Sequence, residues 1–163
     1  MSQSSESSFV YVIFIRTTPE KLWSALTDAN QMKEYWFGMH IDTEWRTGAE
    51  WQMVFPDGRV ADTGEILELE RPKRIRLKWR NEFRPELKAE GFALCTLEIE
   101  PVGVAVQLTI THTIEGADSK FIRAVSGGWP KILSNLKSLL ETGKVVLTEA
   151  DHSHADEPAG VAF

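Results

Sequence analysis

Between residue 39 and residue 115, apolar and polar positions alternate along most of the chain, as expected of half-buried β-strands. The alternation runs through residues 39–55, 60–70, 74–80, 93–100 and 104–112. Turn-forming sequences separate these runs, among them Pro56-Asp57-Gly58-Arg59. The run Phe9–Ile15 (FVYVIFI) lacks the alternation, and it predicts a strand buried on both faces. Gly64, inside the run 60–70, predicts a bulge or a close approach of two backbones.

Helical signals flank the predicted strands. Thr18-Pro19-Glu20 provides the cap residue, the proline and the early acid of a helix start, and a short second helix is expected over 31–36. The strongest signal spans Gly128–Thr142, where apolar residues recur at helical spacing before the stop signal Gly143. This apolar stripe extends back to about residue 118, and Pro130 is expected to kink the helix.

The order of these elements predicts the fold class. One strand, two short helices, a series of antiparallel strands and a long last helix indicate an α+β domain. Its antiparallel sheet would be covered on one face by the C-terminal helix. Residues 81–91 are polar and contain Pro85, which predicts a loop over the sheet.

Composition narrows the classes of partner. The chain has 163 residues, a formal net charge of −6, six tryptophans and eight phenylalanines. The negative charge argues against nucleic acid. The basic residues between 71 and 80 alternate with apolar ones, which indicates the solvated face of a strand. The many aromatic residues indicate either a packed core or an aromatic-lined cavity.

The expected domain organisation is a leader over 1–7, one domain over 8–147 and an acidic disordered tail over 148–163. Cys95 is the only cysteine, so no internal disulfide forms. We expect a cytoplasmic protein, because no signal peptide or apolar run of membrane-spanning length is present. His152 and His154 do not provide the four positioned ligands of a structural metal site, so no metal is expected.

Several segments match one known superfamily in order and spacing. They are Thr18–Asp28, Glu34–Gly38, Asp57–Arg59, Asp62–Glu68, Leu108–His112 and Ser126–Pro130. On these segments, residues 8–143 resemble the START-like, or SRPBCC, superfamily. The branch that they resemble is named after the C-terminal domain of the activator of the heat-shock protein 90 ATPase. The resemblance implies a helix-grip fold, in which a curved antiparallel sheet of seven strands grips the last helix. It also implies a cavity for hydrophobic ligands between sheet and helix.

The candidate cavity residues are the large inward-facing side chains and one histidine. They are Trp36, Trp51, Met53, Phe55, Trp79, His112, Trp129 and Leu133. His112 lies on an apolar strand face, which leaves three interpretations open: a core histidine, a polar anchor for a ligand, or a general base. No catalytic residue, metal site or cofactor is expected, because no motif for one occurs in the chain.

Three functions remain compatible with the sequence. The first is a binding protein for a small hydrophobic or amphipathic molecule, present as a monomer or weak homodimer. The second is a cyclase-, aromatase- or hydrolase-type enzyme that uses the same cavity. The third is a chaperone-interacting module that uses its outer surface. A buried carboxylate or arginine in contact with His112 would favour the second.

Overall fold

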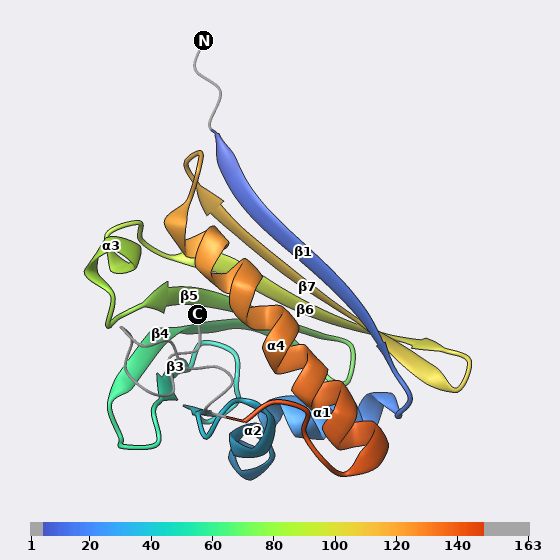
Figure 1. The fold of residues 1–163 in the computed structure, drawn as a ribbon. Coiled ribbons are helices and arrows are strands. Elements are labelled where there is room, and N and C mark those ends of the chain that lie inside the picture. Colours follow the sequence, from blue (N-terminus) through green and yellow to red (C-terminus); the bar gives the residue numbers. More distant parts are fainter. Residues whose placement is uncertain (1–4, 149–163) are drawn as a thin grey trace.

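The computed structural model describes residues 5–148. Seven strands form one antiparallel sheet in the order β1-β7-β6-β5-β4-β3-β2. The strands are β1 (Glu6–Ile15), β2 (His40–Asp42), β3 (Glu50–Val54), β4 (Val60–Glu70), β5 (Arg74–Asn81), β6 (Ala93–Val102) and β7 (Ala105–Glu115). The helices are α1 (Pro19–Thr27), α2 (Ala29–Tyr35), α3 (Pro85–Lys88) and α4 (Lys120–Thr142). The long helix α4 crosses one face of the curved sheet, and α1 and α2 lie at one end (Figure 1). The predicted α+β helix-grip fold is confirmed.

The prediction that β1 is buried on both faces is wrong. Val10, Val12 and Phe14 are 59%, 46% and 50% exposed. Alternate residues of the strand are less exposed and pack against the core on the face that α4 covers. A single-layer sheet covered by one helix leaves its other face in solvent. A continuous apolar run therefore does not imply burial on both faces when the strand lies at the sheet edge.

Side-chain caps set the boundaries of α1 and α2. The Thr18 hydroxyl accepts a hydrogen bond from the backbone N–H of Lys21, and Pro19 is the first residue of α1. Asp28 ends α1 and caps α2 by accepting hydrogen bonds from the N–H groups of Asn30 and Gln31. Because Asp28 is the cap, α2 begins at residue 29 rather than at the predicted residue 31.

The long helix begins where its apolar stripe begins. The Ser119 hydroxyl caps it by accepting from the N–H of Ile122 at 3.0 Å. Glu90, from the connection between β5 and β6, accepts a hydrogen bond from the N–H of Lys120 at 2.8 Å. The helix continues through Pro130 and ends at Gly143, whose φ of +83° favours glycine.

Two predictions about neighbouring segments need correction. The connection over residues 81–91 contains the short helix α3, which begins at Pro85 because proline suits the first helical position. On α4, Trp129, Leu133 and Leu136 are buried as their spacing predicts. Leu140, which the same stripe would bury, is only partly buried because it lies in the last turn of the helix.

After α4, the chain folds back against the helix. The Asn135 side chain is fully buried, and its Oδ1 accepts hydrogen bonds from the N–H groups of Val146 at 3.0 Å and Leu147 at 2.7 Å. Its Nδ2 donates to the Leu147 carbonyl oxygen at 3.0 Å. Leu147 packs against the core. Asn135 therefore fixes the segment that ends the described part of the chain.

Truncation separates this fixed segment from the residues beyond it. A chain ending at Thr148 should keep the melting temperature of the full chain, because it keeps every contact of Asn135. A chain ending at Lys144 should lose about 1–3 kcal/mol, because the buried Oδ1 of Asn135 then loses both of its donors, while Nδ2 keeps the Tyr35 carbonyl oxygen. Thermal unfolding of both chains checks this expectation. A large loss in the chain ending at Thr148 would show that residues 149–163, which lie outside the described residues, pack on the domain.

Candidate functional site

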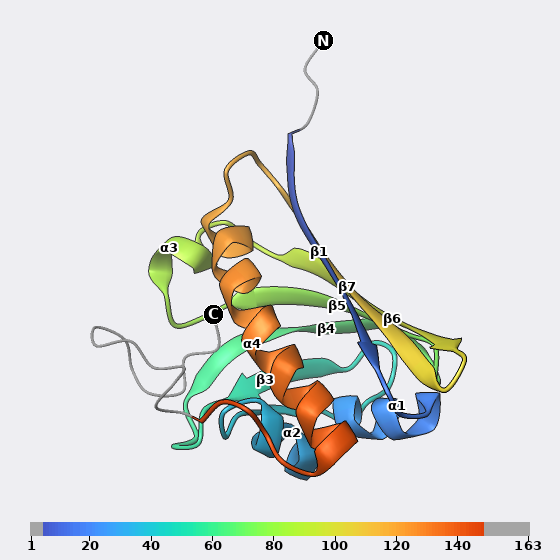
Figure 2. The ribbon, with the colours of Figure 1, turned by 45° about the vertical axis from the view of Figure 1, so that its right-hand side comes forward.

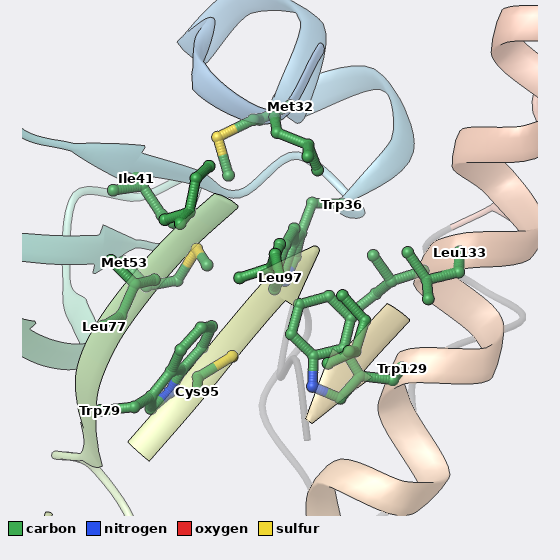
Figure 3. Close-up of a cluster of buried hydrophobic side chains, with 14 of the residues drawn as sticks. Met32, Trp36, Ile41, Met53, Leu77, Trp79, Cys95, Leu97, Trp129 and Leu133 are labelled. Atoms are coloured by element: carbon green, nitrogen blue, oxygen red, sulfur yellow. The ribbon is translucent and has the colours of Figure 1, made fainter. Parts of the chain in front are cut away.

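Three tryptophans from different elements meet between the sheet and α4. Trp36 follows α2, Trp79 lies on β5, and Trp129 lies on α4 (Figure 3). The ring centroids of Trp36 are 6.3 Å from Trp79 and 5.1 Å from Trp129, and those of Trp79 and Trp129 are 6.0 Å apart. Each side chain is at most 2% exposed. We call these three residues the tryptophan cluster, and it connects α4, the sheet and the helical end of the domain.

The tryptophan cluster leaves little open space around it. An inner cavity of about 20 Å³ remains, lined by Leu26, Met32, Tyr35, Trp36, Ile41, Trp45, Ile75, Leu77, Trp79, Leu97 and Trp129. A cavity of that size holds about one water molecule. Its lining is almost wholly apolar, and apolar cavities do not retain water well. In this conformation the indole rings themselves fill the space between sheet and helix.

Trp45 separates this inner cavity from a pocket at the surface. The outer pocket has a volume of about 290 Å³ and is lined by Trp23, Thr27, Trp45, Leu69 and Arg71. Trp45 lines both spaces. It lies between β2 and β3 with φ of +50°, a left-handed conformation that is uncommon for a bulky residue. The sequence pattern did not indicate Trp45, because the residue lies in a loop without periodicity.

His112 lies on β7 against the tryptophan cluster. Its ring centroid is 5.5 Å from that of Trp79 and 5.8 Å from that of Trp129, and Phe121 packs on it at 5.6 Å. The side chain is fully buried, and neither ring nitrogen has a hydrogen-bond partner within residues 5–148. Burial lowers the pKa of His112 from 6.5 to about 3. The imidazole is therefore neutral at physiological pH.

Trp79 also has a buried carboxyl group as a neighbour. Asp62, on β4, is fully buried opposite Asn81 of β5. Burial raises the pKa of Asp62 from 3.8 to about 7; the nearby Trp79 and Asn81 side chains oppose this rise, and the charge of Glu82 adds to it. Sequence reasoning missed Asp62. The available signal was its register, because Asp62 is two residues from Gly64 and four from Ile66, both on the inward face of the same strand.

These two buried groups predict opposite pH dependences of stability. The folded-state pKa of Asp62 is raised. Its contribution to the free energy of unfolding is therefore fully present below pH 4 and is lost as the pH rises towards 7. The folded-state pKa of His112 is lowered. Its contribution to the free energy of unfolding is therefore fully present above pH 6.5 and is lost as the pH falls towards 3. Between pH 4 and pH 6.5 the two slopes, each about 1.4 kcal/mol per pH unit, oppose each other.

Single variants should reveal each slope. Relative to wild type, the free energy of unfolding of Asp62→Asn should rise with pH between 4 and 6.5, because only the His112 slope remains. In His112→Leu it should fall with pH over the same interval. Urea denaturation in a pH series measures both differences. Differences that do not change with pH would show that these groups titrate alike in the folded and unfolded states.

The predicted cavity residues lie at different distances from the tryptophan cluster. The Trp51 ring lies 4.7 Å from that of Trp79, and Met53 and Leu133 belong to the same buried cluster (Figure 3). Phe55 lies elsewhere in the core, where its ring contacts Phe83 at 5.2 Å. Of the eight predicted cavity residues, Trp36, Trp79 and Trp129 line the inner cavity, whereas Trp51, Met53, Phe55, His112 and Leu133 do not.

Other chemistry is limited in the described residues. Burial raises the pKa of the Cys95 thiol well above its usual value, which disfavours the reactive thiolate. Within residues 5–148, no group of three or more His, Cys, Asp or Glu side chains is arranged to hold a metal ion. His152 and His154 lie outside these residues. No helix in the described part of the chain is long and apolar enough to cross a membrane.

Solved structures share this fold at low sequence identity. Protein MLL2253 from Mesorhizobium loti has a TM-score of 0.72 and 22% identity, over 85% of this chain and 100% of that one. The HSP90 activator PFC0360w from Plasmodium falciparum has a TM-score of 0.67 and 22% identity, over 82% and 95%. The Aha1 dimer from Colwellia psychrerythraea has a TM-score of 0.69 and 20% identity, over 85% and 98%. At this level of identity, the likeness concerns the fold alone.

Sequence comparison gives the family. Among curated protein sequences, none matches this chain significantly. The family described as "Activator of Hsp90 ATPase homolog 1-like protein" matches residues 16–141, which run from the end of β1 into the last turn of α4. This match covers most of the chain and includes all three residues of the tryptophan cluster. The chain therefore belongs to the Activator of Hsp90 ATPase homolog 1-like family.

Proposed function

We propose that this protein binds a small, mainly apolar molecule at the tryptophan cluster, between the sheet and α4. The observation that carries the proposal is the inner cavity, lined by aliphatic and aromatic side chains, together with His112, which packs on Trp79 and Trp129. Neither ring nitrogen of His112 has a partner among residues 5–148. Buried polar groups are usually hydrogen-bonded. An imidazole without a partner inside an apolar site is therefore suited to meet the one polar group of a ligand.

The geometry also indicates the shape of the ligand. Space for more than one water must come from displaced rings, since the inner cavity measures about 20 Å³. Trp36 and Trp129 are the rings best placed to move, because neither belongs to the sheet. Trp36 lies on the loop after α2, and Trp129 lies on α4. A flat aromatic or polycyclic molecule would replace indole contacts by similar stacking contacts. One hydroxyl or carbonyl group on it would bond to His112.

Trp45 gives this site an access route. Rotation of its side chain would join the inner cavity to the outer pocket, because Trp45 lines both. The outer pocket combines apolar side chains with Arg71, so its mouth suits an amphipathic molecule. Ligand uptake would then consist of Trp45 displacement followed by opening of the tryptophan cluster.

Enzymatic chemistry in the same cavity is a second candidate, and Asp62 is the observation that favours it. Asp62 and His112 both neighbour Trp79, and the pKa of Asp62 is close to neutrality. Cyclase- or hydrolase-type catalysis needs an acid or base within reach of the substrate. A ligand that displaced the tryptophan cluster would come near both groups. Loss of turnover in Asp62→Asn, with ligand affinity retained, would distinguish this candidate from binding alone.

A pair of matched ligands tests the binding proposal. Naphthol and naphthalene share a flat apolar body, but only naphthol carries a hydroxyl group. Both should bind saturably and quench tryptophan emission, and naphthol should bind about fivefold more tightly because of one hydrogen bond to His112. His112→Leu should abolish this difference between the two ligands. Trp129→Leu should change both affinities.

Arg76→Ala is the control, because Arg76 lies on the outer face of β5 and pairs with Glu68. Its affinities should equal those of wild type. Absence of saturable binding by either ligand, or an equal effect of Arg76→Ala and Trp129→Leu, would refute the proposal. A role of the outer surface, such as contact with a chaperone, would then become the leading hypothesis.

A further inference from the structure

The strand β1 is an edge of the sheet. Within residues 5–148 it pairs only with β7, and the two views of the ribbon show no other helix or strand along its outer side (Figures 1 and 2). Edge strands usually carry lysine, proline or a bulge that prevents pairing with another chain. Between Glu6 and Arg16, β1 has no charged residue and no proline, and its register with β7 has no shift. From Glu6 to Ile13 this edge lacks the usual protection, whereas at Phe14 and Arg16 the side chains of Lys137 and Glu141 on α4 bond to its backbone.

The hydrogen-bond ladder between β1 and β7 shows which backbone groups of β1 point away from β7. The N–H of Gly116 donates to the carbonyl oxygen of Ser5 at 2.8 Å, so the pair of residues 5 and 116 is hydrogen-bonded. In an antiparallel ladder, hydrogen-bonded and non-hydrogen-bonded pairs alternate. The backbone groups of residues 6, 8, 10, 12 and 14 therefore point away from β7. The bond from Lys137 Nζ to the Phe14 carbonyl oxygen, at 2.7 Å, agrees with this assignment.

Exposed apolar side chains belong to the same residues. Val10, Val12 and Phe14 are about half exposed on the face of the sheet opposite α4. Together with Ser8 they form what we call the β1 edge strip (Ser8, Val10, Val12 and Phe14). Apart from the Phe14 carbonyl oxygen, which already accepts from Lys137, it combines backbone groups that point away from β7 with side chains that gain free energy on burial.

We propose that β1 pairs antiparallel with β1 of a second copy of this chain, with Tyr11 on the twofold axis, so that the sheet continues across the dimer. In this register Val10 lies opposite Val12 of the second copy, and these two residues exchange backbone hydrogen bonds. Pairing at Phe14 and Arg16 would in addition require Lys137 and Glu141 to release their backbone groups. The strip is self-complementary, as an isologous interface requires.

Charge complementarity favours a second copy of this chain as the partner, and it favours this register. Glu6 and Arg16 are both exposed and lie ten residues apart, symmetrically about Tyr11. With Tyr11 on the axis, Glu6 of each copy faces Arg16 of the other, which gives two cross-strand pairs of opposite charge. A shift by two residues in either direction places Glu6 opposite Phe14 or Thr18 and loses both pairs. The interface is one strand wide, so the dimer is expected to be weak and dependent on concentration.

Sedimentation equilibrium of the full chain over a concentration series tests the proposal. Wild type should dimerise as its concentration rises. Val10→Pro should remain monomeric yet folded, because the N–H that it removes faces the edge and not β7. Val12→Lys should also abolish dimerisation. Thr109→Lys is the matched control, because Thr109 lies opposite Val12 on β7 and away from the edge, and it should leave the dimer intact.

A charge exchange tests the register. Glu6→Arg and Arg16→Glu should each weaken the dimer, and the double variant should restore it. A wild type that stays monomeric at all concentrations, or a dimer that survives Val10→Pro, would overturn the proposal. So would dimerisation that appears only after removal of residues 149–163, because the edge would then be covered within one chain. Failure of the charge exchange to restore association would refute the register with Tyr11 on the axis.

Discussion

Replacing Gly64 with alanine is expected to destabilise the domain by about 3 kcal/mol or more. Gly64 lies on the inward face of β4, opposite Trp51 of β3. A Cβ atom at this position would overlap the carbonyl oxygen of Lys78 on β5 and lie 2.6 Å from Trp51 Nε1. The same space holds the hydrogen bond from Trp51 Nε1 to the Lys78 carbonyl oxygen, at 3.0 Å. Of the bulge and the close approach predicted as alternatives for this glycine, the structure shows the close approach.

Relief of the overlap is costly because it requires movement of backbone. The carbonyl group of Lys78 belongs to β5, and displaced Trp51 would press on Trp79, whose ring lies 4.7 Å away. Gly127→Ala provides the control. Gly127 is an exposed position inside α4, and a Cβ there meets no atom within 4 Å. It should raise stability by about 0.5–1 kcal/mol. Equal effects of the two substitutions in chemical denaturation would contradict this account of the sheet.

Truncating Leu136 to alanine should cost about 2–5 kcal/mol, because the side chain is fully buried on the face of α4 that packs against the sheet. The loss combines the transfer free energy of the removed atoms with the cavity that they leave. Leu139→Ala is the matched control, since Leu139 is only partly buried on the same helix. It should cost clearly less. A loss below about 0.5 kcal/mol for Leu136→Ala would be incompatible with the position of α4.

Much of the fold could be predicted because its signals are local. The period of two in β3 to β7, the threonine cap of α1 and the leucine stripe of α4 each follow from spacing within a short segment. The burial of β1 could not be predicted in this way. Its apolar run is the same whether a second layer covers it or not, and only the position of the strand in the sheet decides between the two.

The candidate site was less predictable, because it depends on contacts between distant segments. Inward-facing aromatic residues could be identified, but whether their rings leave a cavity or fill it depends on how Trp36, Trp79 and Trp129 pack together. Asp62 could have been found from its register on β4. Trp45 could not, because its role comes from lying between two pockets.

The tryptophan indole N–H signals in a nitrogen-15 NMR spectrum test the central claim most directly. The chain has six tryptophans, and each gives one signal. On titration with naphthol, the signals of Trp36, Trp79 and Trp129 should shift most and saturate together, because the ligand enters among their rings. Trp23 lines the outer pocket but not the inner cavity, so its signal should shift less than those three. Shifts that are confined to Trp23, or that never saturate, would contradict a binding site between the sheet and α4.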